Sequence, residues 1–220
     1  MGYCWAGFEN ITGVDIAPQP RYPFEFVQGD ALEFLAEHGR GFDFIHASPP
    51  CQGYSVMRHL PSLAEKEYPL LIDPLRILLQ ATGRHYVIEN VMGAKLDANW
   101  LCGGMFDLPM YRHRYFESNF LWFAPDHPPH VHSIRRGRKL GSRSRDIVHS
   151  GYKPLPKRTS SKDFVHPEYW ENKMSPGVAV TRIAMQIDWM TGVELCQAIP
   201  PAYTQYVGTQ WLNTHGAQDA

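Results

Sequence analysis

The chain has 220 residues, a formal net charge of -1, 44% hydrophobic residues and 20% charged residues. That length suits one large domain or a domain with a smaller insertion, and the composition excludes a fibre or a low-complexity chain. No apolar run approaches the about 18 residues of a membrane span, and the first residues lack the basic start and apolar core of a signal peptide. We therefore expect a cytoplasmic protein without a membrane partner.

Strands and helices alternate along the first half of the chain. We expect a first strand within residues 9–17 that ends at Asp15, and a second strand that turns at Gly29 into a helix from Asp30. A third, within residues 41–50, has an apolar run that suits burial on both faces of a parallel sheet.

Further along, residues 62–83 have helical spacing with Gly83 as the stop, and residues 85–91 form a fourth strand. The alternation predicts an α/β fold with a mostly parallel sheet. Residues 125–180 predict a loop-rich insertion, because Pro, Gly, Ser, His and Arg are frequent there and periodicity is weak.

Regular structure is expected again from residue 181. A last helix over residues 200–213 would carry Pro200 and Pro201 in its first turn, followed by a frayed tail over residues 214–220.

Charge is distributed unevenly. From His130 to Lys162 the sequence holds ten Lys or Arg and one acid, Asp146, which leaves 11 of 21 basic residues and 21 of 22 acids for the remainder. A basic segment on an acidic body predicts a polyanion partner for that segment, with Tyr152, Tyr169 and Trp170 able to stack or pack; ordinary solvated loop charge is the alternative.

Neither metal nor disulfides are expected. The four cysteines are widely spaced and form no Cys-x-x-Cys pair, so they should be reduced thiols. Three histidines close together in the sequence are candidate zinc ligands: His127, His130 and His132. However, no cysteine or carboxylate pair nearby in the sequence completes a tetrahedral ligand set.

Four side chains stand at or just past predicted strand ends: Asp15, Asp30, Cys51 and Glu89. Ligands of such sheets bind beyond the carboxyl ends of the strands, so we expect these four side chains to share one edge.

Cys51 is a candidate nucleophile. A thiolate reacts strongly once its pKa is lowered, and "SPPCQGYS" holds the thiol behind two prolines and before polar residues. A buried cysteine acting as a small hydrophobe is the alternative.

Glu89 in "VIENV" is a candidate acid. A carboxylate that follows an apolar run costs free energy unless it is paired or takes part in catalysis. The alternative is that Glu89 and Asn90 only cap the next loop. Together Cys51 and Glu89 suggest a thiol that adds to an electrophilic ring and an acid that protonates the ring nitrogen.

The chain resembles the DNA cytosine-5 methyltransferases of the bacterial and phage type. "SPPCQGYS" resembles the nucleophile motif of that family, "ENV" its proton-donor motif and "MYRHRYF" its arginine motif, over about residues 1–124 and 185–210. The resemblance implies a Rossmann-like S-adenosylmethionine-dependent fold. It also implies three parts: a catalytic domain over 1–124, a target-recognition insertion over 125–184 and a C-terminal return over 185–220.

The resemblance further implies roles for single residues. Cys51 would attack C6 of a flipped-out cytosine and Glu89 would contact N3, which makes C5 nucleophilic toward the methyl group of S-adenosylmethionine. Arg114 would contact the base and Arg112 would support the site. The implied cofactor-binding residues are Asp15, Ile16, Asp30, Ala31 and Pro49. The implied DNA-binding residues are Gln52, Ser55, Asn90, Arg135, Arg136 and Arg138.

The implied partner is double-stranded DNA, bound by a monomer in a bacterial or phage-infected cell, for restriction-modification or for phage self-protection. The family's glutamine before Arg112 is replaced by Met110, and "LCQAIPPAYTQYVG" matches the last motif loosely. The glycine-rich turn and first strand of the family do not precede Met1, so the strand ending at Asp15 and the strand ending at Ser48 would lack the neighbour between them.

Several alternatives remain open at this point. The chain is either a truncated form of an active enzyme or a stand-alone protein that binds cofactor poorly, and as written we expect weak or no methyl transfer. The alternatives to methyl transfer are a DNA-binding remnant, a subunit that needs a partner segment, or a cytosine-modifying enzyme with another one-carbon donor.

Overall fold

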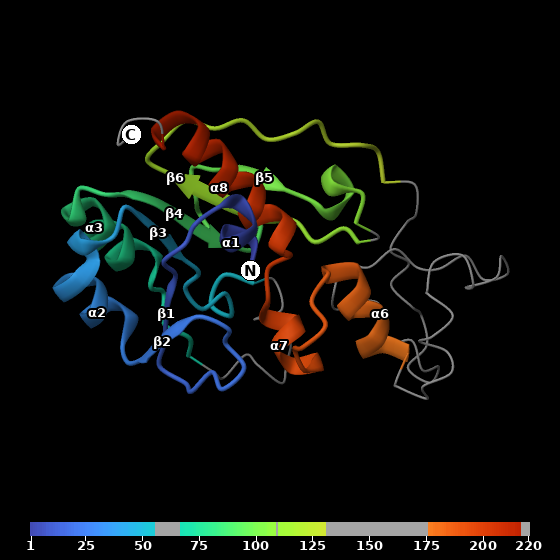
Figure 1. The fold of residues 1–220 in the computed structure, drawn as a ribbon, viewed down its shortest axis with the longest axis horizontal. Coiled ribbons are helices and arrows are strands. Elements are labelled where there is room, and N and C mark those ends of the chain that lie inside the picture. Colours follow the sequence, from blue (N-terminus) through green and yellow to red (C-terminus); the bar gives the residue numbers. More distant parts are fainter. Residues whose placement is uncertain (56–66, 109, 131–175, 217–220) are drawn as a thin grey trace, which may run out of the picture. The chain divides into compact units, whose positions relative to one another are not determined.

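The computed structural model describes residues 1–55, 67–108, 110–130 and 176–216 (Figure 1). The chain divides into two compact units and passes repeatedly from one to the other. Unit 1 comprises Met1–Phe8, Cys102–Arg112 and Pro125–Ala220, and unit 2 comprises Glu9–Leu101 and His113–Ala124. The three-part division expected from the sequence stays a prediction.

Unit 2 contains two sheets. The smaller pairs two parallel strands, β1 (Thr12–Asp15) and β2 (Glu25–Gln28). The larger has the order β3-β4-β6-β5 and consists of β3 (Phe44–Ala47), β4 (His85–Asn90), β6 (Arg114–Ser118) and β5 (Asn99–Leu101). Strands β3 and β4 are parallel, whereas β6 is antiparallel to both β4 and β5.

The four predicted strands are confirmed as β1 to β4, but the prediction of a mostly parallel sheet is wrong for the larger sheet, where β6 is antiparallel to both of its neighbours. In the part of the chain that the structure describes, the single partner of β1 is β2. Within the same residues the single partner of β3 is β4, so the two parallel pairs belong to different sheets. The added strands β5 and β6 make antiparallel ladders. Strand β5 has three residues, too few to carry an alternating pattern in the sequence.

Two helices of unit 2 begin and end at local signals that the sequence contains. Helix α2 (Ala31–His38) starts at Asp30, whose carboxylate accepts hydrogen bonds from the amides of Leu32 and Glu33, and the short 3-10 helix η1 (Gly39–Gly41) follows it. Helix α3 (Ile72–Thr82) ends at Gly83, whose φ of 70° is left-handed and suits glycine.

The predicted helix over residues 62–83 is therefore confirmed in its second half. Residues 62–66 lie outside the described residues, and residues 67–71 are not helical. Pro69 lies in that non-helical stretch, and its missing amide hydrogen disfavours helix there.

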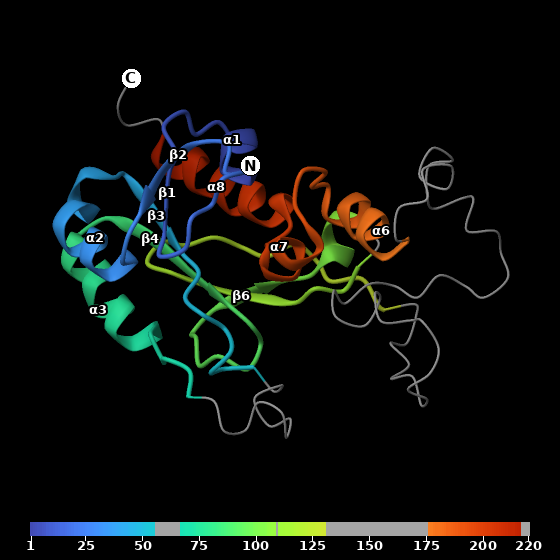
Figure 2. The ribbon, with the colours of Figure 1, turned by 90° about the horizontal axis from the view of Figure 1, so that it is seen from below.

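The core of unit 2 lies between its helices and β4. The buried side chains of Leu35, Leu75, Leu79, Tyr86 and Ile88 form one cluster, which packs α2 and α3 together against β4 (Figures 1 and 2). Burial of this apolar surface is the main stabilisation of the layer.

A partly buried ion pair joins α3 to β6. Arg76 donates from Nε to Glu117 Oε1 at 2.5 Å and from Nη2 to Glu117 Oε2 at 2.9 Å, and it also reaches the exposed Asp73 at 2.6 Å. Glu117 is only 8% exposed and also accepts from the amide of Asp97 at 3.2 Å. Glu117 raises the pKa of Arg76 above its ordinary value, so the guanidinium stays charged in this bidentate contact.

Unit 1 is built from helices: α1 (Gly2–Ala6), the 3-10 helix η3 (Gly103–Phe106), α6 (Pro176–Met185), α7 (Gly192–Gln197) and α8 (Pro201–His215). Helix α1 packs against α8 (Figures 1 and 2). The contact is close, because a Cβ at Gly2 would collide with the carbonyl of Pro201 and a Cβ at Gly208 would lie 2.9 Å from the Tyr3 ring.

The predicted last helix is confirmed with Pro201 as its first residue, but it continues to His215, into the tail that was expected to fray. Helix α6 begins at Pro176, inside the segment expected to be loop, where a proline suits the first helical position. None of the helices in residues 1–55, 67–108, 110–130 and 176–216 is both long and apolar enough to cross a membrane.

We predict that Glu117→Gln lowers the free energy of unfolding by about 2 kcal/mol, because it weakens the charge-assisted hydrogen bonds that the half-buried Arg76 makes to the buried Glu117. Asp73→Asn, which removes the exposed partner of the same arginine, should change it by less than about 0.5 kcal/mol. Urea denaturation of both variants measures this difference. Equal losses in the two variants would contradict the account.

Candidate functional site

The carboxyl ends of β3 and β4 form one edge of the larger sheet. The strands are parallel, with Ala47 opposite Ile88, so the segment from Ser48 to Cys51 leaves the sheet beside Glu89 and Asn90. The Asn90 side chain is 1% exposed, and its Nδ2 donates to the Pro49 carbonyl at 2.9 Å. This hydrogen bond holds the loop that carries Cys51 against the end of β4.

Cys51 begins a tight turn. Its carbonyl accepts hydrogen bonds from the amides of Tyr54 at 3.1 Å and Ser55 at 2.9 Å. The Cys51 side chain is half-buried, neither enclosed in the core nor fully open, and Gln52 beside it is exposed. The position therefore suits a thiol that meets a ligand at the edge of the sheet.

Two contacts that Tyr54 makes with residues outside the predicted motifs fix this turn. The Tyr54 hydroxyl accepts from the amide of Ile72 at 3.0 Å, which ties the turn to the start of α3. A Cβ at Gly93 would collide with the Tyr54 carbonyl, so only glycine lets the loop after β4 approach the turn this closely. Sequence reasoning missed the roles of Tyr54 and Gly93. The glycine three positions after "EN" is the one feature of the sequence that could have indicated the close approach.

Glu89 is buried and paired. It is 6% exposed, and its Oε1 lies 3.0 Å from Nε of Arg114, the first residue of β6. Glu89 faces Phe116 across the antiparallel ladder, so Arg114 reaches it as a diagonal neighbour. The guanidinium stabilises the carboxylate form of Glu89, while Arg114 also donates from Nη1 to the His113 carbonyl at 2.8 Å.

His46 on β3 was not among the predicted residues. Its Nε2 lies 2.9 Å from the Ser48 hydroxyl, two residues along the strand. Burial lowers the pKa of His46 to about 4, so the imidazole is neutral at pH 7. A neutral imidazole can exchange a hydrogen bond with Ser48 without adding charge to this edge.

Four of the five predicted cofactor-binding residues, all except Pro49, lie at the carboxyl edge of the smaller sheet. Asp15 is the last residue of β1, and its carbonyl accepts from the amide of Gly29 at 3.1 Å. The Asp15 carboxylate accepts from the Ala17 amide at 2.8 Å and from Gln19 Nε2 at 3.2 Å.

Their neighbours on this edge face solvent. Ile16 is 73% exposed, and Asp30 and Ala31 are exposed where they start α2. The prediction that four strand-end residues share one edge is therefore wrong in part, because Asp15 and Asp30 lie at the end of the smaller sheet and Cys51 and Glu89 at the end of the larger one.

Arg112 belongs to unit 1. It is 4% exposed, and its Nη2 donates to the Cys196 carbonyl at 2.5 Å. The Arg112 carbonyl accepts from the Tyr203 hydroxyl at 2.6 Å. These bonds anchor Arg112 to α7 and α8. Met110, two residues earlier, is fully buried as an apolar side chain.

The remaining predicted residues divide by their place in the chain. Pro49 accepts the Asn90 hydrogen bond, and Gln52 and Ser55 lie in the Cys51 turn. Arg135, Arg136 and Arg138 lie outside the described residues, as do His132, Tyr152, Tyr169 and Trp170.

The family of C-5 cytosine-specific DNA methylases matches residues 18–100 of this chain. This range contains Asp30, Cys51, Glu89 and Asn90. It covers the strands β2, β3 and β4, whereas β1 lies before it. The match supports a DNA cytosine methyltransferase in general. No curated protein matches the chain.

We predict that Arg114→Met lowers the free energy of unfolding by about 3 kcal/mol, because it removes the guanidinium counter-charge from the buried Glu89 carboxylate. Adding Glu89→Gln to that variant should recover most of the loss, since the neutral amide needs no counter-charge. Urea denaturation of the two single variants and the double variant gives the coupling energy.

The matched control is Arg40→Met, which removes an exposed arginine of unit 2 and should change stability by less than about 0.5 kcal/mol. Additive losses in the double variant would show that Arg114 and Glu89 do not depend on each other.

Proposed function

We propose that this chain is a DNA cytosine-5 methyltransferase in which Cys51 forms a transient bond to the cytosine ring and Glu89 acts at the ring nitrogen. The observation that carries the proposal is the hydrogen bond from Asn90 to Pro49. It holds the thiol-bearing loop beside the strand that ends in Glu89, inside the range that matches the family.

The proposed chemistry begins with addition of the thiolate. The Cys51 sulfur bonds to C6, the C5–C6 double bond opens, and the electron pair moves toward C5 and the N3 side of the ring. Glu89, a carboxylate paired with Arg114 in the free chain, takes up a proton once the base is bound and donates it, or a hydrogen bond, at N3, which makes C5 nucleophilic. After C5 has taken its new group, loss of the C5 proton and of the sulfur restores the aromatic ring.

Arg114 has a part in this scheme through its pairing with Glu89. The guanidinium carries five N–H donors, of which two reach Glu89 and the His113 carbonyl. The remaining donors suit a carbonyl oxygen of the flipped base. Arg112 is proposed as a support of the site on the family resemblance, and Cys196 and Tyr203 hold it within unit 1.

The residues at the smaller sheet fit S-adenosylmethionine, which when bound supplies an electrophilic methyl group. The Asp15 carboxylate has about four acceptor directions and uses two of them on Ala17 and Gln19, which leaves capacity for ribose hydroxyls. Asp30 accepts both helix-capping hydrogen bonds, from the amides of Leu32 and Glu33, at its Oδ1 atom. Ile16 and Ala31 add exposed surface beside these carboxylates, and Pro49 is proposed to line the same cofactor.

Double-stranded DNA is the proposed substrate. The target base must leave the stack before the thiol reaches C6, which costs a few kcal/mol. Phosphate contacts from the basic segment with Arg135, Arg136 and Arg138 would repay that cost in a salt-dependent way. Gln52 and Ser55, in the turn after the nucleophile, are proposed to lie along the DNA.

A second candidate function is supported by the presence of two separate sheets in unit 2. Strands β1 and β3 lie in different sheets, and within the described residues each has a partner on one side only. A strand between them would join the proposed cofactor edge to the Cys51 edge. The candidate is therefore a subunit that binds DNA and needs such a strand from another segment before it transfers methyl groups.

We predict that the chain releases tritium from mixed-sequence duplex DNA labelled at C5 of cytosine, without any cofactor. Addition of the thiolate at C6 lets C5 take a solvent proton and lose its label when the sulfur leaves. Cys51→Ser and Glu89→Gln should each reduce the rate at least about 100-fold. Cys4→Ser, at an exposed cysteine of unit 1, should leave it unchanged.

Labelled S-adenosylmethionine separates the two candidates. Tritium release together with methyl transfer supports the complete enzyme, and release without methyl transfer supports the subunit that needs a strand. DNA binding without any tritium release would overturn the thiol mechanism.

A further inference from the structure

Unit 1 holds a cluster of one cysteine and two histidines that the proposed function does not use. Cys102 caps the start of η3, and His127 and His130 lie in the segment that follows Pro125. Their ligand atoms, Sγ of the cysteine and one nitrogen of each imidazole, lie within 4.8 Å of one another. We propose that Cys102, His127 and His130 bind a zinc ion.

The distances match a tetrahedral zinc site. Cys102 Sγ lies 3.5 Å from His130 Nε2, and His127 Nε2 lies 3.0 Å from His130 Nε2. Zinc with Zn–S of about 2.3 Å and Zn–N of about 2.05 Å places sulfur and nitrogen about 3.6 Å apart and two nitrogens about 3.3 Å apart. Small shifts of flexible side chains therefore complete the coordination.

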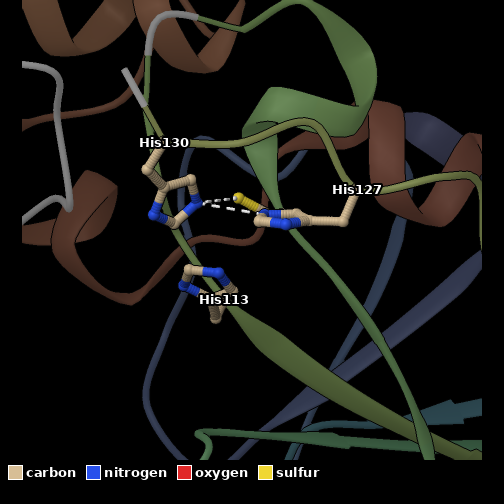
Figure 3. A group of neighbouring side chains, drawn as sticks. His113, His127 and His130 are labelled. Carbon is tan, nitrogen blue, oxygen red and sulfur yellow. Dashed lines mark hydrogen bonds between the residues drawn. The ribbon is translucent and has the colours of Figure 1, made fainter. Parts of the chain in front are cut away.

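Figure 3 shows His127 and His130 turned toward each other, with the dashed hydrogen bond between their rings. Two imidazoles and a thiolate are ligands that zinc prefers, whereas magnesium and calcium prefer oxygen. Three protein ligands leave one coordination position for water or another donor. His113, also drawn in Figure 3, belongs to unit 2, and the proposed site is built from unit 1 alone.

The supporting structure holds the ligands before any metal binds. The His130 ring stacks on the buried Tyr111 ring at a centroid distance of 3.8 Å and an angle of 17°. A Cβ at Gly103 would collide with the Met110 carbonyl, so the segment from Cys102 to Met110 folds closely on itself. Pro128 and Pro129 restrict the backbone between the two histidines.

Burial of the sulfur distinguishes a metal ligand from a nucleophile. Cys102 is 0% exposed, so a thiolate–imidazole pair made with His130 could not meet a substrate. A buried thiolate is stabilised by a bound cation, which removes the cost of burying its charge. The cluster therefore fits metal binding better than covalent catalysis.

Sequence reasoning considered His127 and His130 for zinc but missed Cys102, because Cys102 and His130 are 28 positions apart. The expectation of no metal weighed the histidines with their neighbours in the sequence only. A zinc ion here would fix the segment 125–130 to η3. It would thereby anchor the start of the basic segment that follows His130.

The test uses the full-length chain without an affinity tag, stripped with a chelator and then titrated with Co²⁺ and Zn²⁺. We expect about one metal ion per chain, a sulfur-to-cobalt charge-transfer band, and displacement of Co²⁺ by Zn²⁺. Metal should be lost at acid pH, because protonation of the imidazoles and the thiolate competes with the ion.

Variants assign the ligands. Cys102→Ser should abolish the charge-transfer band, and His127→Ala and His130→Ala should each weaken Zn²⁺ binding at least about 100-fold. His130 is exposed, so its variant should fold even where a change at the buried Cys102 does not, and circular dichroism checks both.

Two controls match the ligands in residue type. Cys196→Ser and His215→Asn change an exposed cysteine and the histidine at the end of α8 in the same unit, and both should bind Zn²⁺ as the unchanged chain does. No cobalt–sulfur band in the unchanged chain, or undiminished Zn²⁺ affinity in His130→Ala, would overturn the proposal.

Discussion

The hydrogen bond from the Asn90 amide to the Pro49 carbonyl is the contact on which the account of the active site depends. A parallel pair of strands brings two loops to one edge but does not fix how those loops turn away from the sheet. Here a buried side chain of one loop holds the backbone of the other, two residues before Cys51. Loss of a buried hydrogen bond leaves both partners desolvated, so the arrangement is stabilised by more than the bond alone.

The charges around this edge follow from the same geometry. Glu89 is buried in β4 and tolerated there because Arg114 reaches it from β6. The second ion pair of the sheet, between Arg76 and Glu117, repeats this arrangement and ties α3 to β6. Both pairs are far better placed than an exposed pair to hold their elements in register. The edge that carries the proposed chemistry is therefore tied to β6 by an ion pair, while the Asp15 edge beside α2 faces solvent.

Local signals in the sequence predicted the parts of the fold that local chemistry decides. Asp30 caps a helix, Gly83 ends one and Pro201 begins one, because each acts within its own turn of backbone. Cys51 and Glu89 were identified because polar groups at the ends of apolar strands are conspicuous. Their shared edge followed from the parallel pairing of β3 and β4.

Other features could not be predicted, because they depend on residues far apart in the chain. The partner of Arg76 is 41 positions away, and the Tyr203 hydroxyl reaches the Arg112 carbonyl across 91 positions. The separation of β1 from β3 was expected from the family resemblance, whereas the antiparallel strands β5 and β6 were not. Three-residue strands and single glycines such as Gly93 have too little pattern to predict such contacts.

The central claim is that the Cys51 sulfur bonds to C6 of a pyrimidine, and trapping that bond tests it most directly. Duplex DNA of mixed sequence, with 2-pyrimidinone in place of cytosine, presents a ring that is more electrophilic at C6 and forms a longer-lived adduct. The account predicts a denaturation-resistant complex whose cross-linked peptide, by mass spectrometry, carries the modification on Cys51. A complex linked through another residue, or bound DNA with no covalent product, would contradict it.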